Sequence, residues 1–207
     1  MTAPLTLYTN PRSRGRIARW MLEEVGASYD TVLLDYAASM KDPAFLAINP
    51  MGKVPAIRHG ETIVTETAAI CAYLADAFPD AGLAPPHADR GAYYRWLFFA
   101  AGPLEAAITN ASLGAEFAPE RAMSLGYGTL ANTLDTLEAA LTDRGHIAGD
   151  HFSAADVYVG SHLGFGMAFG TITPRPAFQH YHTALTERPA YRRAAALDDA
   201  DIPAQQG

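Results

Sequence analysis

The chain has 207 residues, 49% of them hydrophobic, and a formal net charge of −7, which allows one large or two small domains with a buried core. The acidic balance and the absence of a Lys/Arg run argue against nucleic acid as a partner, and no run of about 18 apolar residues exists to span a membrane. The single cysteine, Cys71, excludes an internal disulfide, and the first residues have no signal-peptide layout, so we expect a cytoplasmic protein.

The first 78 residues alternate between strand and helix patterns. An apolar run at residues 5–8 predicts a strand, and apolar residues recur at helical spacing from Ile17 to Val25, before the C-cap residue Gly26. Ser13 stands where the N-cap of this helix belongs. The pattern then predicts a strand at 29–34, a short helix at 41–47, a hairpin of strands 54–57 and 62–64, and a helix at 66–78. This order predicts a mixed sheet with helices on its faces.

The stretch 52–57 contains a Val54–Pro55 step inside an apolar run. Proline has no N–H for a sheet ladder, and a cis bond here would turn the N–H and C=O of Val54 out of the sheet, toward a ligand. About ten residues later Glu66 and Thr67 open a helix, whose N-terminus offers free N–H groups to carboxylates. Together the two pieces predict a docking site for an extended, acidic, peptide-like small molecule.

A breaker-rich stretch at 79–88 separates this half from a second half without strand patterns. Ser153 and Asp156 form a capping box, in which the aspartate takes the place of the usual Glu or Gln. Helices are predicted at 93–100, 119–141, 157–169, 176–185 and 189–196, followed by a frayed tail from Asp198. We therefore expect an α/β domain at 1–78, a linker at 79–88 and an all-helical domain at 89–207.

The order of these features resembles that of the cytosolic glutathione S-transferases. The α/β half, the Val54–Pro55 step, the Glu66–Thr67 pair and the capping box all occur in the family's sequence order, and the resemblance covers roughly residues 4–196. It implies a thioredoxin-like domain with a mixed four-stranded sheet that binds glutathione, and a helical domain that binds a small hydrophobic electrophile. It also implies a homodimeric detoxification transferase that needs no metal.

The resemblance assigns roles to the residues of the predicted docking site. Val54, held by a cis bond to Pro55, pairs its backbone with the cysteinyl group of glutathione, while Glu66 and Thr67 bind the γ-glutamyl end. Lys53 matches a position that often meets the glycine carboxylate. The charges agree, because glutathione has two carboxylates and one ammonium, and charge-assisted hydrogen bonds contribute about 1.5–3 kcal/mol each.

The resemblance also implies a hydrogen-bond donor to the glutathione thiolate near the end of the first strand. Ser13, counted back from Gly26, takes the place of the serine in the serine-type classes, which indicates a bacterial-type enzyme of the Ser type rather than the Cys type. Thr9 is the alternative hydroxyl, and Asn10 could donate through its amide. Cys71 lies in a later helix, where a small core residue is expected.

Four arginines flank Ser13. Arg12 and Arg14 lie beside the proposed thiolate, where they could lower the thiol pKa or hold an acidic substrate. Arg16 and Arg19 are expected on a solvated helix face.

The acceptor side is expected to include Phe99, Pro103 and Leu104, and the histidines form no ligand set of familiar metal-site spacing. Two alternatives to a transferase remain at this stage. One is a glutathione-dependent isomerase or peroxidase on the same fold, and the other is a glutathione-binding module without turnover.

Overall fold

The computed structural model describes residues 3–202, apart from the side chain of Pro119. Its internal contacts divide the chain into two compact units. The first extends to Leu83 and takes in the chain from Glu187 onward, and the second is Ala84–Thr186. The two units are described in turn.

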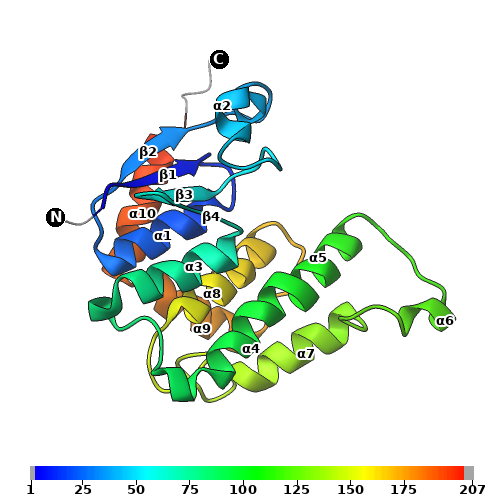
Figure 1. The fold of residues 1–207 in the computed structure, drawn as a ribbon. Helices are drawn as coiled ribbons and strands as arrows, with labels where there is room; N and C mark the ends of the chain where they lie inside the picture. Colours follow the sequence, from blue (N-terminus) through cyan, green and yellow to red (C-terminus); the bar gives the residue numbers. More distant parts are fainter. Residues whose placement is uncertain (1–2, 203–207) are drawn as a thin grey trace. The chain divides into compact units, whose positions relative to one another are not determined.

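The first unit is built on a four-stranded sheet with strand order β2-β1-β3-β4 (Figure 1). β1 (Leu5–Thr9) is parallel to β2 (Asp30–Leu33) and antiparallel to β3 (Ala56–His59), which forms a hairpin with β4 (Thr62–Thr65). α1 (Gly15–Val25) and α3 (Thr67–Ala77) are the long helices of this half, and η1 (Ser39–Lys41) and α2 (Pro43–Leu46) are short. The predicted mixed sheet of four strands with helices is confirmed.

Alternation along β1 sends its side chains to two separate cores. Leu5 and Leu7 are buried in β1, Ile17 and Met21 are buried in α1, and Ile70 is buried in α3, which packs against α1. Tyr8 has the opposite parity and packs against a second cluster formed by Leu34, Met40, Phe45 and Ala56, which include residues of η1 and α2. Covering both faces of the sheet in this way fixes the ends of β1 and β3, where the predicted site residues lie.

α10 (Pro189–Ala200) lies along α1 in the first unit (Figure 1). Four side chains of α1 form ion pairs with it or with Arg188, the residue before it. The pairs are Arg16–Asp199, Arg19–Asp198 with Arg19–Asp201, Glu23–Arg193 and Glu24–Arg188. Asp198 is fully buried, so the predicted frayed tail from this residue is wrong up to Ala200.

The same packing changes the expectations for Arg16, Arg19 and the helical domain. The expected solvated face is wrong for Arg19, which is 3% exposed, while Arg16 is half-buried. α10 groups with the sheet unit and not with the helices of 84–186, unlike the division expected at 89–207. The physical reason is charge, because the carboxylates of α10 neutralise arginines that α1 brings beside it.

The buried pair at this interface predicts a pH dependence of stability. Burial raises the pKa of Asp198 from 3.8 to about 6, although Arg19 and Arg16 oppose the rise. Between these values the folded protein holds the proton more tightly than the unfolded chain, so this site makes the free energy of unfolding fall as pH rises from 4 to 6. Asp198→Asn should remove that slope, on the order of 2 kcal/mol across the window.

Urea unfolding at pH 4, 5, 6 and 7 measures this effect. Asp199→Asn, on the same helix but 65% exposed, is the matched control and should keep the slope of the unchanged protein. If the free energy of unfolding varied with pH in the same way for Asp198→Asn and for the unchanged protein, the raised pKa would not belong to Asp198.

The second unit is helical, and residues 84–186, all of whose backbone is described, contain no strand. α8 (Ala154–Ala168) is buried along most of its length and contacts α4 (Gly91–Phe99) and α9 (Pro176–Thr186). α4 continues through a π-helical turn, η4 (Ala100–Leu104), into α5 (Glu105–Ser112). Two short turns, η2 (Pro79–Ala81) and η3 (His87–Asp89), occupy the predicted linker.

The single helix predicted at 119–141 is wrong. α6 (Pro119–Ala122) ends after one turn, and α7 (Leu130–Leu141) begins separately. Gly128 has a φ of 67°, a left-handed conformation that a continuous helix cannot contain. Thr129 then caps the new helix by accepting a hydrogen bond from Asn132 N–H at 3.1 Å.

Candidate functional site

The Val54–Pro55 peptide bond is cis, as the family resemblance implies. A buried asparagine, Asn49, shapes the turn before it by donating to Lys53 O at 2.7 Å and accepting from Met51 N–H at 3.1 Å. Lys41 Nζ donates to the carbonyl of Gly52 at 2.9 Å. β3 begins only at Ala56, and within residues 3–202 neither the N–H nor the C=O of Val54 has a partner. The half-buried Val54 therefore offers one backbone donor and one acceptor to a ligand.

Glu66 and Thr67 open α3, as predicted. Glu66 is the N-cap, and its carbonyl accepts the first helical bond from Ile70 N–H at 2.9 Å. Its φ of 65° places a residue with a Cβ in the left-handed region, a strain of about 1–3 kcal/mol that is found most often at functional sites. Glu66 is exposed and Thr67 is buried, so an exposed carboxylate lies beside the amino end of a helix.

Ser13 lies one residue before the N-cap of α1, which is Arg14, so its predicted place as the N-cap is wrong. Its hydroxyl donates to Asn10 O at 2.7 Å and accepts from Gly15 N–H at 2.9 Å. The side chain still reaches the first amide of the helix, from a tight turn rather than from the cap. A Ser13 hydroxyl that served a thiolate would turn its hydrogen away from Asn10 O.

The other two predicted donors, Asn10 and Thr9, differ from Ser13 in their contacts and burial. Asn10 donates through its amide to Leu34 O at 2.7 Å, and its Oδ1 accepts from Arg12 N–H at 2.9 Å. Thr9 is fully buried, and its Oγ1 makes no hydrogen bond among the described residues. Asn10 and Ser13 are half-buried and Thr9 is fully buried, so Ser13 has the more accessible of the two predicted hydroxyls.

Gly15 lies against Thr9 and Ser13. A Cβ on Gly15 would overlap Thr9 Oγ1 and come within 2.9 Å of Ser13 Oγ. We expect Gly15→Ala to lower the free energy of unfolding by about 1–3 kcal/mol, the usual cost of overpacking. Adding Thr9→Ala should restore part of the loss, because it removes the hydroxyl that Gly15→Ala would strike. Chemical unfolding of the two single variants and the double variant measures this coupling, and strictly additive losses would contradict it.

The flanking arginines divide into two pairs. Arg12 and Arg14 are exposed beside Ser13, and Tyr36 OH donates to the carbonyl of Arg12 at 3.3 Å. Arg16 donates to Pro11 O at 3.3 Å and, with Arg19, pairs with α10 as described above. The first pair can face a ligand, and the second pair connects helices.

The predicted acceptor residues lie in the second unit, at the junction of α4 and η4. Phe99 packs edge-on against Trp96, with ring centroids 5.2 Å apart, and is half-buried. Pro103 lies inside the π-helical turn, where it has no N–H to donate to the regular hydrogen-bond pattern of an α-helix. Leu104 is fully buried and belongs to the core of this unit. π-helical turns of this kind occur frequently at functional sites.

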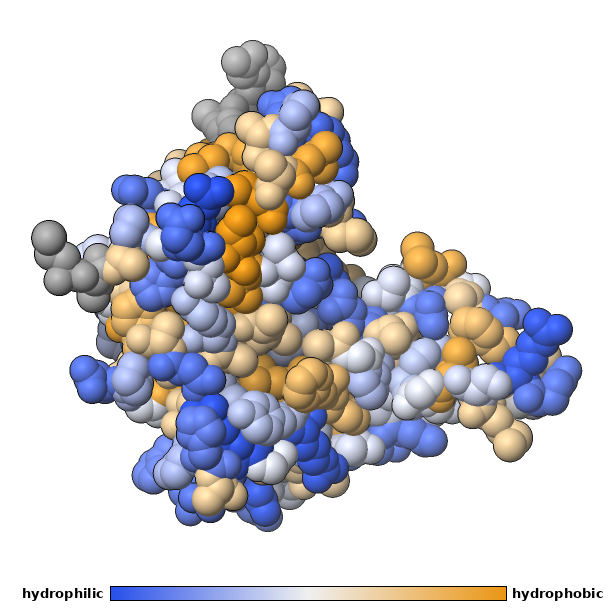
Figure 2. Space-filling model, viewed as in Figure 1, coloured by the Kyte–Doolittle hydropathy of each residue, from blue (hydrophilic) through white to orange (hydrophobic). Residues whose placement is uncertain are grey.

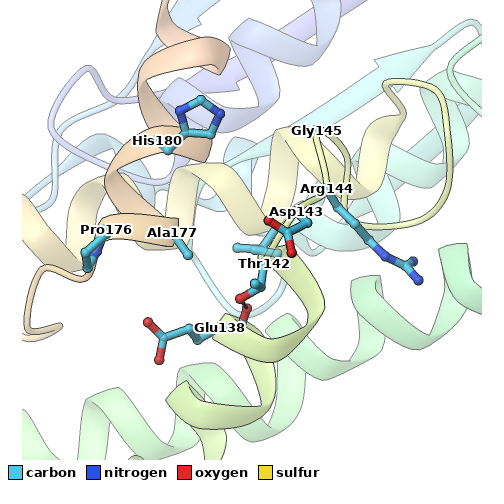
Figure 3. Close-up of a pocket in the computed structure, with 9 residues that line it drawn as sticks. Glu138, Thr142, Asp143, Arg144, Gly145, Pro176, Ala177 and His180 are labelled. Atoms are coloured by element: carbon cyan, nitrogen blue, oxygen red, sulfur yellow. Dashed lines mark hydrogen bonds between the residues drawn. The ribbon is translucent and has the colours of Figure 1, made fainter.

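A separate pocket of about 560 Å³ lies in the second unit, lined by Glu138, Leu141, Thr142, Asp143, Arg144, Gly145, Pro176, Ala177 and His180 (Figure 3). Glu138 is ion-paired with Arg175 at 2.7 Å, and Arg144 points away from His180 and Glu138 in this view. No predicted site residue lines this pocket. Sequence reasoning gave no signal for it, because its walls come from α7, α9 and the loop after α7.

The described residues offer neither a metal centre nor a solvent-accessible thiol. No group of three or more His, Cys, Asp or Glu side chains there could hold a metal ion. Cys71 is fully buried, and burial raises the pKa of its thiol far above the ordinary range. Among residues 3–202, no helix has the length and apolar character needed to cross a bilayer.

Two family descriptions match the chain. "Glutathione S-transferase, N-terminal domain" matches residues 3–76, and "Glutathione S-transferase, C-terminal domain" matches residues 105–193. Glutathione S-transferase 3 of Zea mays is 31% identical over 212 residues, which covers 94% of each chain. Glutathione S-transferase GstB of Escherichia coli strain K12 is 30% identical over 186 residues, covering 85% of this chain and 89% of the relative.

A solved structure of a protein from the same group is also similar to this chain. The chain is similar to a sphingomonad glutathione S-transferase complexed with glutathione, with a TM-score of 0.75 and 31% identity over 94% of this chain and 98% of the other.

Proposed function

Because the chain belongs to the glutathione S-transferase family, we propose that it is a serine-type glutathione transferase, which activates the thiol of glutathione for addition to a hydrophobic electrophile. The observation that carries the proposal is the backbone of Val54, whose N–H and C=O have no partner within residues 3–202. A bound tripeptide needs such a donor and acceptor to align its central residue.

The charges around Val54 suit the two ends of glutathione. The exposed carboxylate of Glu66 pairs with the γ-glutamyl ammonium, and Thr67 with the amino end of α3 binds the neighbouring carboxylate. Lys53 is exposed one residue before Val54 and meets the glycine carboxylate. The similar sphingomonad glutathione S-transferase was solved with glutathione bound, which supports glutathione as the ligand proposed here.

Ser13 stabilises the glutathione thiolate. A free thiol has a pKa near 8.5, so most of it is protonated at neutral pH, and each unit of lowering takes about 1.4 kcal/mol. The Ser13 hydroxyl and the amino end of α1 supply this stabilisation. The thiolate sulfur then attacks the electrophilic carbon, an S–C bond forms, and either a leaving group departs with its electron pair or the acceptor takes up a proton. Cys71 is too deeply buried to replace this sulfur.

The acceptor-side residues of the second unit include Phe99 and Pro103. Leu104 supports this segment from the core. In the first unit, Arg12 and Arg14 are exposed near Ser13, where positive charge suits an acidic substrate. We assign glutathione binding to residues 1–78 and acceptor binding to the helices that follow the linker at 79–88.

We further propose that this bacterial-type enzyme acts as a cytoplasmic homodimer. Large exposed apolar side chains support self-association, because such surface marks interaction sites; examples are Phe98 of α4 and Ile63 of β4. Figure 2 shows hydrophobic surface over the strands of the first unit on the face that it presents.

The proposed function is tested by glutathione binding and turnover with the whole chain. Calorimetry measures glutathione affinity, and a panel of an aryl halide, an epoxide and an α,β-unsaturated carbonyl tests conjugation. Binding together with conjugation of at least one electrophile is expected. Binding without any turnover would favour a glutathione-binding module, and absence of binding would overturn the proposal.

Glu66→Gln provides a residue-level check of the binding site. Loss of the charge should raise the KM for glutathione about 10-fold or more, because it removes one charge-assisted hydrogen bond. The change in kcat should be smaller. Glu61→Gln, an exposed acid in the turn between β3 and β4, is the matched control and should behave like the unchanged protein. Equal KM values for the two variants would show that Glu66 does not bind the ammonium.

A further inference from the structure

We propose that Arg16 is a positioning residue for Ser13, because its guanidinium joins the loop that carries Ser13 to Asp199 of the C-terminal helix α10. The inference rests on the proposed function, in which Ser13 stabilises the glutathione thiolate. It assigns to α10, which lies outside the predicted glutathione-binding segment, a part in setting the reactivity of the bound thiol.

The first step is the geometry of Arg16. It belongs to the first turn of α1, and its Nη1 donates to the carbonyl of Pro11 at 3.3 Å. Its Nη2 donates to Asp199 Oδ1 at 2.8 Å. The two bonds leave the same planar guanidinium, so the carbonyl of the loop and the carboxylate of the helix are held at a fixed separation.

The second step is that Asp199 is an anchored partner. Its neighbours Asp198 and Asp201 both pair with the buried Arg19, and further along the interface Arg193 pairs with Glu23 at 3.0 Å. α1 and α10 therefore lie side by side along their lengths (Figure 1). These ion pairs hold the backbone that carries Asp199 against α1.

The third step is the small effect expected on folding. The Arg16 and Asp199 side chains are 25% and 65% exposed, and an ion pair with that much solvent contributes little to stability. Ser13 lies two residues after Pro11, and its own hydroxyl contacts are confined to Asn10 and Gly15. A shift of the loop would thus move the Ser13 hydroxyl with little cost to the fold, and small displacements of a catalytic group can lower rates about 100-fold.

Position and charge can be separated by substitution. Arg16→Lys keeps the positive charge but loses the planar fork, and Asp199→Ala removes the anchor while Arg16 stays. If Arg16 acts through position, both variants should raise the pKa of the bound thiol. If it acts through its charge, Arg16→Lys should behave like the unchanged protein and Asp199→Ala should lower that pKa.

The experiment titrates the ultraviolet absorbance of the glutathione thiolate in the complex, without an electrophile, and the pH profile of kcat/KM with one. For Arg16→Lys and for Asp199→Ala we expect the thiol pKa to rise by about half a unit to one unit, hence about a 3- to 10-fold lower kcat/KM at pH 6.5. Glutathione affinity should change less than about 2-fold, since neither side chain touches the Val54 or Glu66 region. Arg193→Lys, at the same helix interface but without a contact to the loop, is the control.

A second readout needs no ligand. Amide hydrogen exchange of residues 10–14 should be faster in Arg16→Lys and Asp199→Ala than in Arg193→Lys or the unchanged protein. Unchanged exchange together with an unchanged thiol pKa overturns the positioning role. An unchanged protein that binds no glutathione overturns the proposed function instead, and faster loop exchange in the two variants would still support the tie between Arg16 and Asp199.

Discussion

Replacing Asp156 by alanine is expected to lower the free energy of unfolding by about 3–5 kcal/mol, a large part of the stability of a typical domain. Asp156 is fully buried at the start of α8. Its Oδ1 accepts from Ile147 N–H at 2.8 Å and from Tyr181 OH at 2.7 Å. Its Oδ2 accepts from Ser153 N–H at 2.9 Å and from Ser153 Oγ–H at 3.0 Å. Alanine would leave these donors without an acceptor in the core.

Three further variants grade this effect. Asp156→Asn keeps an acceptor and should fall between the unchanged protein and Asp156→Ala. Tyr181→Phe removes one donor and leaves the carboxylate with three bonds, so about 1 kcal/mol is expected. Asp150→Ala, an exposed acid in the loop before α8, is the matched control. Thermal and urea unfolding measure the stability of all four variants. An Asp156→Ala variant with the melting temperature of the control would show that the hydrogen bonds to Asp156 contribute little to stability.

Replacing Ser13 by alanine is expected to lower kcat/KM for conjugation about 100-fold, the usual effect of losing one hydrogen-bond donor to a developing or bound anion. Glutathione affinity should stay nearly unchanged, because the proposed function assigns binding of the peptide to Val54, Lys53, Glu66 and Thr67. The pH profile should move to higher pH, toward the pKa of the free thiol.

Two variants show whether the hydroxyl itself is responsible. Ser13→Thr keeps a hydroxyl and should retain most of the activity. Thr9→Val removes the buried alternative hydroxyl with little change of shape, and should leave the thiol pKa where it is. A conjugation rate for Ser13→Ala equal to that of the unchanged protein, with a slow Thr9→Val variant, would transfer the role to Thr9. A melting-temperature measurement on Ser13→Ala accounts for the lost bonds to Asn10 and Gly15.

Local patterns predicted most of the fold because they encode local physics. The strand at the apolar run 5–8, the cap at Gly26 and the Glu66–Thr67 helix start each depend on neighbours within a few residues, and the structure confirms all three. The capping box at Ser153 and Asp156 is confirmed for the same reason. The cis bond before Pro55 is confirmed too, but it was implied by the family resemblance, because the chemistry of an X-Pro bond permits the cis isomer without requiring it.

The helix prediction was wrong where an apolar pattern continues past the end of a helix, since α6 ends at Ala122 and α7 begins only at Leu130. The apolar positions from 119 to 141 suggest one helix, yet the left-handed Gly128 and the Thr129 cap divide it. Ser13 was displaced by one position from the cap for a similar reason, since helix ends depend on the hydrogen bonds that the last loop residues make.

The sequence by itself determined the order of strands and helices and the acid at the start of α3, because short-range sterics and capping govern these features, while the cis Val54–Pro55 bond was implied by the family resemblance. Only the tertiary structure decided that Thr9 is buried while Ser13 is partly accessible, and that Arg16 and Arg19 pair with carboxylates of the C-terminal segment. These features depend on contacts between residues up to 183 positions apart in the sequence. Such contacts are set by the packing of the whole unit, and no periodic sequence pattern encodes them.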